Sequence, residues 1–337
     1  MDRLSGFHAR LLNYNTKLIC IFSEVMTTTN QGVSNKGSLW GIDLGGTKIE
    51  GLILKSLDDP QILFRDRVPT EAIQGYEHIL VQVKKIVDAM ENAQGYKPER
   101  IGFSTPGVLD PKLGTMKNCN TVVMNGQRMK DDLERVLGVQ AEMANDADCF
   151  ALAEARYGVV KEQFPDARVV FGVILGTGVG GGLVVDGRAI VGLQGIAGEW
   201  GHNFLDESGG PCYCGKSGCV ENVISGPALE RYYFKETGNR KPLKDIVALA
   251  ESKVDPTAQK TMLRLIEFFG KGLSVIINIV DPDVIVIGGG VGNIDLLYDR
   301  GLDSVRKYVF NNRLDTPIVR PSLGDSAGVF GAAFLVS

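Results

Sequence analysis

The residues best suited to chemistry are three cysteines within eight positions, Cys212, Cys214 and Cys219, and a histidine ten positions before them, His202. Thiolates and an imidazole are ligands that Zn²⁺ prefers, and a Cys₃His set closes a tetrahedral site. Unliganded thiols are the alternative, and a Cys-x-Cys disulfide is disfavoured by its geometry. The spacing therefore predicts a structural zinc site that holds a loop in place and does not activate water.

Two carboxylates lie close to this cluster in the sequence. Glu199 comes three positions before the histidine, and Glu221 comes two positions after the last cysteine. Carboxylates on a loop that a metal holds rigid could accept hydrogen bonds from sugar hydroxyls. The alternative is that both are solvated surface charges.

A third carboxylate stands at the start of a helical run. Asp146 follows Asn145 and precedes residues 147–157, which have helical spacing. Its structural role would be to cap that helix. Its catalytic role would be that of a general base on a substrate hydroxyl, at a cleft where two lobes join.

Two glycine-rich segments share one pattern. Residues 41–54, GIDLGGTKIEGLIL, align without gaps on residues 172–185, GVILGTGVGGGLVV, which lie 131 positions later. Each is typical of a strand, a glycine turn and a second strand, and such a repeat indicates a duplicated chain. We expect two similar α/β lobes with a glycine hairpin from each facing a common cleft. The alternative is that glycine turns recur by chance.

Neither segment fits the common nucleotide-binding motifs. Residues 176–181 satisfy G-x-G-x-x-G, but β-branched residues follow where a dinucleotide-binding motif needs a helix. Residues 45–48 end in Thr-Lys, where a P-loop requires Lys followed by Ser or Thr. The remaining interpretation is a glycine-lined turn whose backbone amides approach phosphate, as expected for ATP between two lobes.

The phosphate-binding prediction extends to neighbouring side chains and to a third glycine segment. Asp43 is placed to hold a water of Mg²⁺, and Thr47 or Lys48 to donate to phosphate. Residues 288–292 follow a buried strand and are assigned to the adenosine and ribose, although a ligand-free turn would look the same. The predicted ATP and Mg²⁺ residues are Asp43, Gly45, Gly46, Thr47, Lys48, Gly176, Thr177, Gly178, Gly180, Gly288, Gly289 and Gly290.

Strands and helices must alternate along the chain to position these residues. Apolar residues recur with period two or in continuous runs in the expected strands and at helical spacing in the expected helices. The predicted strands are a hairpin over 39–54 and residues 62–68, 100–104, 169–175 and 283–287; the predicted helices are 78–90, 129–137 and 150–157. The fold class is therefore α/β.

Composition excludes several classes of protein. The 337 residues are 44% hydrophobic and 23% charged, which is usual for a soluble globular chain of about two domains. A net charge of −4 and a pI near 5.6 give no basic excess for nucleic acid or a membrane surface. Apolar runs are too short for a membrane span or a signal peptide. We expect a cytoplasmic protein whose partners include small molecules.

The domain boundaries follow from composition and from the repeat. Residues 26–38 are polar and turn-rich, so the fold should begin at Leu39 after an N-terminal appendage, residues 1–38, that is expected to be disordered. Met26 is a second possible start. Residues 39–144 should form a small lobe, and residues 145–323 a large lobe with the zinc motif.

Taken together and in this order, the motifs resemble the ROK family of sugar kinases. The glycine segments, Asn145-Asp146, residues 198–202 and the cysteine cluster with its glutamate carry the resemblance, which covers about residues 39–337. The cysteine–histidine set and the glutamate after it are the most specific parts. Within the family, the bacterial fructokinases, also described as mannokinases, are most similar, through residues 118–120, 124–126, 197–203, 211–216 and 324–333.

The resemblance implies a duplicated, two-lobed actin-like ATPase fold of the ribonuclease H type. Residues 324–337 would return to the small lobe, and the protein would form homodimers. Asp146 would be the catalytic base, and the residues contacting sugar would be Asn145, Glu199, His202 and Glu221, with His202 also a zinc ligand. The cofactors would be ATP, Mg²⁺ and Zn²⁺.

One position departs from the family pattern, and it lies two residues after the predicted base. Asp148 stands where the family usually has Asn. A second carboxylate there would raise the pKa of Asp146 if it pointed inward. We expect it to point away.

The activity implied is transfer of the γ-phosphoryl group of ATP to the 6-hydroxyl of fructose or mannose. A glucose or N-acetylglucosamine kinase is the alternative, because these hexoses present similar hydroxyls to the same acceptors. A sugar-responsive regulator would need a DNA-binding domain before the first glycine turn, and residues 1–38 show no such pattern. A nicotinamide-dependent dehydrogenase is disfavoured by the strand expected after Gly181.

Overall fold

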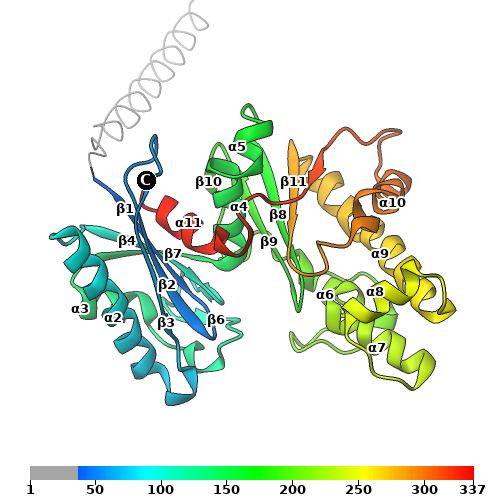
Figure 1. Ribbon diagram of the computed structural model, residues 1–337, viewed down its shortest axis with the longest axis horizontal. Helices are drawn as coiled ribbons and strands as arrows, with labels where there is room; N and C mark the ends of the chain where they lie inside the picture. The colour runs from blue at the N-terminus through cyan, green and yellow to red at the C-terminus, as the bar shows by residue number, and fades with distance from the viewer. Residues whose placement is uncertain (1–36) are drawn as a thin grey trace, which may run out of the picture. The chain divides into compact units, whose positions relative to one another are not determined.

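The computed structural model describes residues 37–337, so the predicted appendage lies outside the described residues except for its last two positions. From Ser38 to Ser337 the chain forms one contiguous unit (Figure 1). None of the helices in this part of the chain is long and apolar enough to cross a membrane.

The first sheet has five strands in the order β3-β2-β1-β4-β7. β2 pairs antiparallel with both β1 and β3, whereas β4 pairs in parallel with β1, and β7 pairs in parallel with β4. Helices α2 and α3 contribute the apolar residues that complete its core. The elements are β1 (Leu39–Leu44), β2 (Lys48–Leu54), β3 (Ile62–Pro69), α2 (Tyr76–Gln94), β4 (Arg100–Thr105), β5 (Val108–Leu109), β6 (Met116–Lys117), α3 (Met129–Leu137) and β7 (Gln140–Asn145).

The second sheet repeats this arrangement in the order β10-β9-β8-β11-β12. Again a hairpin and a third strand are antiparallel, and two further strands are parallel to the first strand. The predicted duplication is therefore confirmed, as is the strand after the second glycine turn. The elements are β8 (Val169–Leu175), β9 (Val179–Val185), β10 (Arg188–Ala189), β11 (Val284–Gly288) and β12 (Ile318–Val319).

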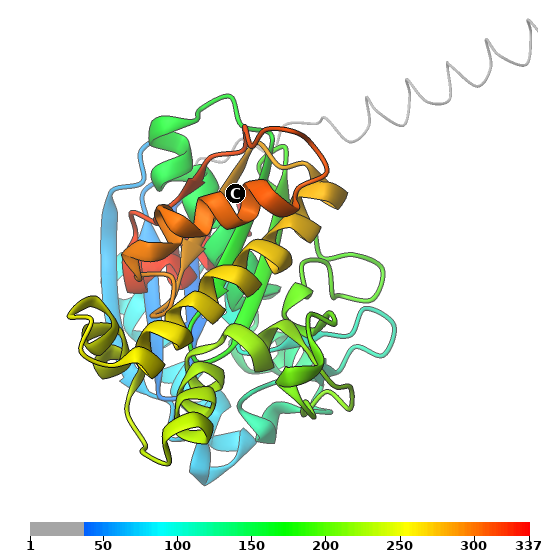
Figure 2. The same ribbon diagram turned by 90° about the vertical axis from the view of Figure 1, so that its right-hand side faces the viewer.

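Helices cover the second sheet on one face. Figure 2 shows α9 and α10 running in front of its strands, and residues of α9 share an apolar core with β8 and β11. The helices are α6 (Val220–Ile224), α7 (Gly226–Thr237), α8 (Leu243–Glu251), α9 (Pro256–Val280) and α10 (Arg300–Tyr308).

Two further helices lie between the sheets. α4 (Asp146–Arg156) packs against β8 and β9, and α11 (Ala327–Phe334) packs against α4, β1 and β4 (Figure 1). Small residues allow this close approach: a Cβ at Gly102 of β4 would collide with the backbone of α11. The last helix of the chain thus completes the packing of the first sheet.

Most predicted elements appear with bounds within two residues of the expectation, and the strand 169–175 and the helix 129–137 match fully. The helix expected over 150–157 instead begins at Asp146 and includes the predicted base. The predicted boundary between residues 144 and 145 falls at the end of β7, and the division into two lobes stays a prediction. α5 (Val159–Gln163) completes the helices of this region.

Candidate active site

Three cavities adjoin one another beside the two hairpins. We name them the hairpin cavity, of about 630 Å³, the central cavity, of about 410 Å³, and the outer cavity, of about 1060 Å³. The hairpin and central cavities share Pro106, Asn120 and Asp146. The central and outer cavities share Asn118, Glu199, His202 and Tyr213. The hairpin and outer cavities share Val122, so the central cavity adjoins two cavities that also meet each other.

Asp146 stands at the junction of the hairpin and central cavities, as the first residue of α4. The helix cap is not Asp146 but Asn145, whose Oδ1 accepts a hydrogen bond from the backbone N–H of Asp148 at 2.6 Å. The alternative role of Asp146 as the helix cap is therefore not supported, and the residue lines both cavities where they meet. Loss of hydration raises the pKa of Asp146 to about 6, and the charges of Asp43 and Glu199 act in the same direction.

The first hairpin forms a wall of the hairpin cavity. Asp43 at the end of β1 and the turn residues Gly45, Gly46 and Thr47 all line it. Burial raises the pKa of Asp43, and the neighbouring charge of Glu50 adds to this. The cavity thus combines a carboxylate with two glycines of a tight turn, as the sequence predicts.

Lys48 does not line any of these three cavities. Its Nζ lies 4.0 Å from the buried carboxylate of Glu50, which also accepts hydrogen bonds from Arg65 at 2.6 Å and Arg67 at 2.9 Å. A fully buried carboxylate requires such partners, and they draw the lysine toward β3. The structure therefore places Lys48 outside the lining of the hairpin cavity, although its charge opposes the rise in the pKa of Asp43.

The glycine segment of the second hairpin lies partly in the central cavity and partly outside it. Thr177, Gly178 and Gly180 line the central cavity. Gly176 lies behind them, where its carbonyl accepts the N–H of Gly226 at the start of α7.

The third glycine segment, Gly288, Gly289 and Gly290, lies beside the second hairpin rather than in the three cavities. The N–H groups of Val291 and Gly292 both donate to the carbonyl of Leu175, the last residue of β8. A Cβ at Gly290 would meet no atom within 4 Å, so the backbone is open at that residue. The structure thus brings the second and third glycine segments together, as expected if one ligand spans both.

The four predicted sugar-contacting residues all line the central cavity: Asn145, Glu199, His202 and Glu221. Burial raises the pKa of Glu199, with a further contribution from the charge of Glu221. Glu221 also reaches the second hairpin, because its Oε2 accepts the N–H of Val179 at 3.0 Å. The cavity therefore offers several hydrogen-bonding groups, which suits a ligand with several hydroxyls.

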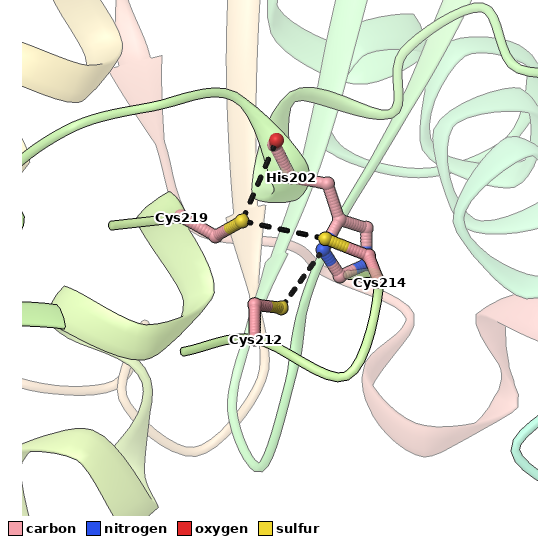
Figure 3. A group of neighbouring side chains, drawn as sticks. All are labelled: His202, Cys212, Cys214 and Cys219. Carbon is pink, nitrogen blue, oxygen red and sulfur yellow. Dashed lines mark hydrogen bonds between the residues drawn. The ribbon is translucent and has the colours of Figure 1, made fainter. Parts of the chain in front are cut away.

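The histidine and the three cysteines of the cluster converge (Figure 3). Their possible ligand atoms all lie within 4.8 Å of one another. Two of the separations are 3.6 Å: Cys212 Sγ to His202 Nδ1, and Cys214 Sγ to Cys219 Sγ. A tetrahedron of ligands about 2.0–2.3 Å from Zn²⁺ has edges of roughly 3.3–3.8 Å, so this donor set fits zinc.

Asp148 lies beneath the site and not in it. Together with Thr105, Val108 and Val191 it lines a separate cavity of about 170 Å³ that Asp146 does not line. Its side chain is only 4% exposed and its Oδ1 has no hydrogen-bond partner among the described residues. Burial raises the pKa of Asp148 to about 8, helped by the charges of Glu199 and Asp146.

Sequence reasoning did not assign Asn118, Asn120 or Tyr213 to the site, although all three line the central cavity. Asn118 has a left-handed backbone, φ 56°, which Asn adopts more readily than most residues. The Tyr213 hydroxyl lies 2.9 Å from His202 Nε2. A signal was present for the two asparagines, since both follow a short strand in a turn-rich stretch.

Comparison with known proteins gives consistent matches over this part of the chain. A family model described as the ROK family matches residues 39–337. An N-acetyl-D-glucosamine kinase of Aliivibrio fischeri is 33% identical over 307 residues, covering 88% of this chain and 98% of that protein. One from Vibrio cholerae is 34% identical over 314 residues, with the same coverage of each chain.

Solved structures agree with these matches. A ROK hexokinase from Thermus thermophilus has a TM-score of 0.79 and 31% identity, covering 88% of this chain and 97% of that one. A ROK family glucokinase from Streptomyces griseus, in complex with glucose and AMPPNP, has a TM-score of 0.70 and 28% identity. This match covers 89% of the chain and 99% of the glucokinase.

Proposed function

The chain belongs to the ROK family, and from this premise we propose that it is an ATP-dependent sugar kinase that phosphorylates the 6-hydroxyl of a hexose. The acceptor predicted from the sequence is fructose or mannose. A second candidate is N-acetylglucosamine, because that is the sugar named for relatives 33–34% identical to this chain. A homodimer in the cytoplasm also stays a prediction.

The observation that supports this proposal most strongly is the place of Asp146. It is shared by a cavity lined by the first glycine turn and a cavity lined by several hydrogen-bonding side chains. Phosphoryl transfer depends mainly on positioning and charge neutralisation, but the alcohol must give its proton to a nearby base. A carboxylate between the two cavities is positioned to accept that proton from a sugar hydroxyl.

The hairpins are suited to hold the phosphates of ATP. The backbone amides of Gly46 and Gly178 would bind phosphate oxygens, and Asp43 would hold Mg²⁺ through water. When bound, Mg²⁺ neutralises charge on the phosphates. The fit rests on the donor set: a carboxylate and glycines of two tight turns line adjoining cavities.

We also propose that Zn²⁺ is held by His202, Cys212, Cys214 and Cys219 as a structural ion. Two features support this role: the four residues leave no ligand position for water, and Glu221 follows the cluster closely. Zinc would fix the short helix that carries Glu221, and thereby the hydrogen bond from Glu221 to the second hairpin.

The test is the Asp146→Asn variant in a coupled ADP-release assay with fructose, mannose, glucose and N-acetylglucosamine. Loss of a positioned general base should lower kcat by about 10²–10⁴-fold. The wild-type rate should fall below pH 6, because protonation of Asp146 removes the base. Folding should be unaffected, since Asn145 and not Asp146 caps α4.

Binding of ATP serves as the control in this experiment and should stay near that of the wild type. A variant within a few-fold of the wild-type kcat, measured where chemistry limits turnover, would exclude Asp146 as the base. Absence of ADP release with all four sugars would contradict the proposed function itself.

A further inference from the structure

The outer cavity is more than twice as large as the central cavity, at about 1060 Å³ against about 410 Å³. Sites for small molecules usually enclose about 300–1,000 Å³, so the central cavity alone has a suitable volume for a hexose. The outer cavity adjoins it through four shared lining residues, two of which, Glu199 and His202, are expected to contact the sugar. A sugar in the central cavity therefore faces a second space that it does not fill.

The position of Asp146 fixes which end of the sugar would face this space. Asp146 lines the hairpin and central cavities but not the outer one, whereas Glu199 and His202 line the central and outer cavities. A hexose with its 6-hydroxyl at Asp146 can direct its opposite edge toward Glu199 and His202. In a pyranose that edge carries C2, with C1 and C3 on either side, so a group linked to C1 can extend into the outer cavity.

The lining of the outer cavity suits a group with apolar faces. Ile196 is 42% exposed, Val275 is 43% exposed and Ile279 is 77% exposed, although aliphatic side chains gain by burial. Val275 and Ile279 lie four residues apart on α9, and hence on one face of that helix. A free hexose in the central cavity would leave all three uncovered.

Polar groups lie among these apolar side chains. Asn125, Asn203 and Lys216 also line the outer cavity, and Asn203 and Lys216 are exposed. A mixed lining of this kind matches a sugar or aryl ring, which has apolar faces and polar edges. It matches an unbranched alkyl chain less well.

Tyr213 stands between the central and outer cavities. Its side chain is 71% exposed, and its ring meets the His202 ring edge-on, with centroids 5.1 Å apart. An aromatic ring at this point can pack against a ring attached to C1 of the sugar while its hydroxyl stays at His202. Tyr213 is thus placed to distinguish a substituted sugar from a free one.

We propose that this site accepts hexose glycosides, in which a ring-sized group linked through C1 occupies the outer cavity while the 6-hydroxyl of the hexose is phosphorylated. The inference rests on the proposed kinase function and narrows its substrate class. The reaction is otherwise unchanged: the O6–H bond breaks, Asp146 takes the proton, and O6 forms the new bond to phosphorus as ADP leaves. The glycosidic bond stays intact.

The experiment compares kcat/KM for glucose and mannose with kcat/KM for their p-nitrophenyl glycosides and for disaccharides with a free 6-hydroxyl on the non-reducing ring. The p-nitrophenyl glycosides test whether the outer cavity accepts an aryl ring, and the disaccharides test whether it accepts a sugar ring. At least one glycoside should be used as well as its parent hexose or better. The product should be shown by mass spectrometry to be a phosphorylated, uncleaved glycoside.

A variant that fills the outer cavity tests whether the group linked through C1 binds there. Ile279→Trp should lower the ratio of kcat/KM for the glycoside to that for the hexose by about tenfold or more. The matched control is Leu263→Trp, also on α9 and 48% exposed but not part of the cavity lining. That control should leave the ratio unchanged.

Two outcomes would overturn the inference. The first is phosphorylation of free hexoses with rejection of every glycoside, which would leave the proposed kinase function standing. The second is an unchanged ratio in Ile279→Trp; if the molecular mass in solution also changes, the apolar rim is an interface between copies of this chain. Failure with all sugars would instead contradict the kinase function.

Discussion

The hairpins β1–β2 and β8–β9 occupy the same position in their sheets, but backbone crowds the second strand only in the second hairpin. At the turn of the first hairpin, a Cβ at Gly46 would meet only the side-chain oxygen of Thr121, at 3.3 Å. In β9, a Cβ at Gly181 would lie 2.6 Å from the carbonyl oxygen of Gly198, and one at Gly182 would collide with that of Ala147. The glycines of β9 therefore serve close packing, whereas Gly46 leaves the first turn open.

The crowding has a consequence for the site. Ala147 follows Asp146, and Gly198 precedes Glu199. Because both backbone segments rest on β9, the two glycines there set the distance between the predicted base and a predicted sugar-binding carboxylate. Glycines in a repeated motif therefore need not all bind ligand.

The largest effect is expected when the proposed zinc cluster, which adjoins the second hairpin through Glu221, is broken. Cys214→Ser should reduce bound zinc from about one ion per chain and lower the free energy of unfolding by about 4 kcal/mol or more, as is typical of lost metal sites. Calorimetry and elemental analysis measure this directly. Because Cys214 is exposed, the new hydroxyl adds no buried polar group.

Hydrogen exchange tests whether the cluster supports the second hairpin but not the first. The amide of Val179, which donates to Glu221, should exchange faster in Cys214→Ser, while the equivalent amide of Lys48 should not. Ser217→Ala in the same exposed loop is the control. Zinc loss with unchanged melting and exchange would show that the cluster does not support the hairpin.

A smaller loss of stability is expected from Gly182→Ala. The added methyl group would collide with the backbone of α4, and overpacking of this kind costs about 1–3 kcal/mol. Thermal unfolding should show a lower Tm, with kcat reduced because Asp146 moves with α4. A Tm equal to that of the wild type would mean that β9 and α4 separate easily, contrary to the packing described above.

An increase in stability is expected from Asp148→Asn, a change in the turn of α4 that rests on β9. Asp148 stays protonated in the folded protein up to pH about 8 but ionises near pH 4 when unfolded. Wild-type stability should therefore fall as pH rises between these values, by at most about 1.4 kcal/mol per pH unit, and level off above pH 8.

The variant lacks this titration, so the difference in Tm between Asp148→Asn and the wild type should grow in favour of the variant from pH 6 to pH 8. Unfolding followed at several pH values checks the slope. A difference that is independent of pH would show that Asp148 is ionised in the folded protein.

The smallest change in stability is expected from Gly46→Ala in the first hairpin. Only a flexible side chain lies near the new methyl group, so the free energy of unfolding should change by about 0.5 kcal/mol or less. KM for ATP should nevertheless rise, because the methyl group lines the hairpin cavity. Unchanged KM with unchanged stability would show that this turn does not contact the nucleotide.

The repeat and the cluster could be predicted because both depend on local spacing. A gapless alignment reveals two equal hairpins, and the four metal-site residues lie within eighteen positions, from His202 to Cys219. The position of Lys48 could not be predicted, since it depends on a buried glutamate whose arginine partners come from β3. The cap of α4 could not be identified from the sequence, because Asn145 and Asp146 are both good caps and only the backbone distinguishes them.

Tyr213 and Asn118 were missed for a different reason. They meet at one cavity because the segment that includes β5 and β6 contacts the loop before Glu199, where the Lys117 Nζ donates to the carbonyl of Gln194 at 2.7 Å. That contact joins positions 77 residues apart, and no local pattern in the sequence reports it.

The placement of α11 sets an order for folding during synthesis. This helix follows the other described helices and strands in the chain, yet its backbone packs against Gly41 of β1 and Gly102 of β4. Chains generally fold from the N-terminus as they emerge from the ribosome. The first sheet must therefore wait with one face uncovered until the segment of α11 has been made, and it can complete its packing only after the strands of the second sheet have been made.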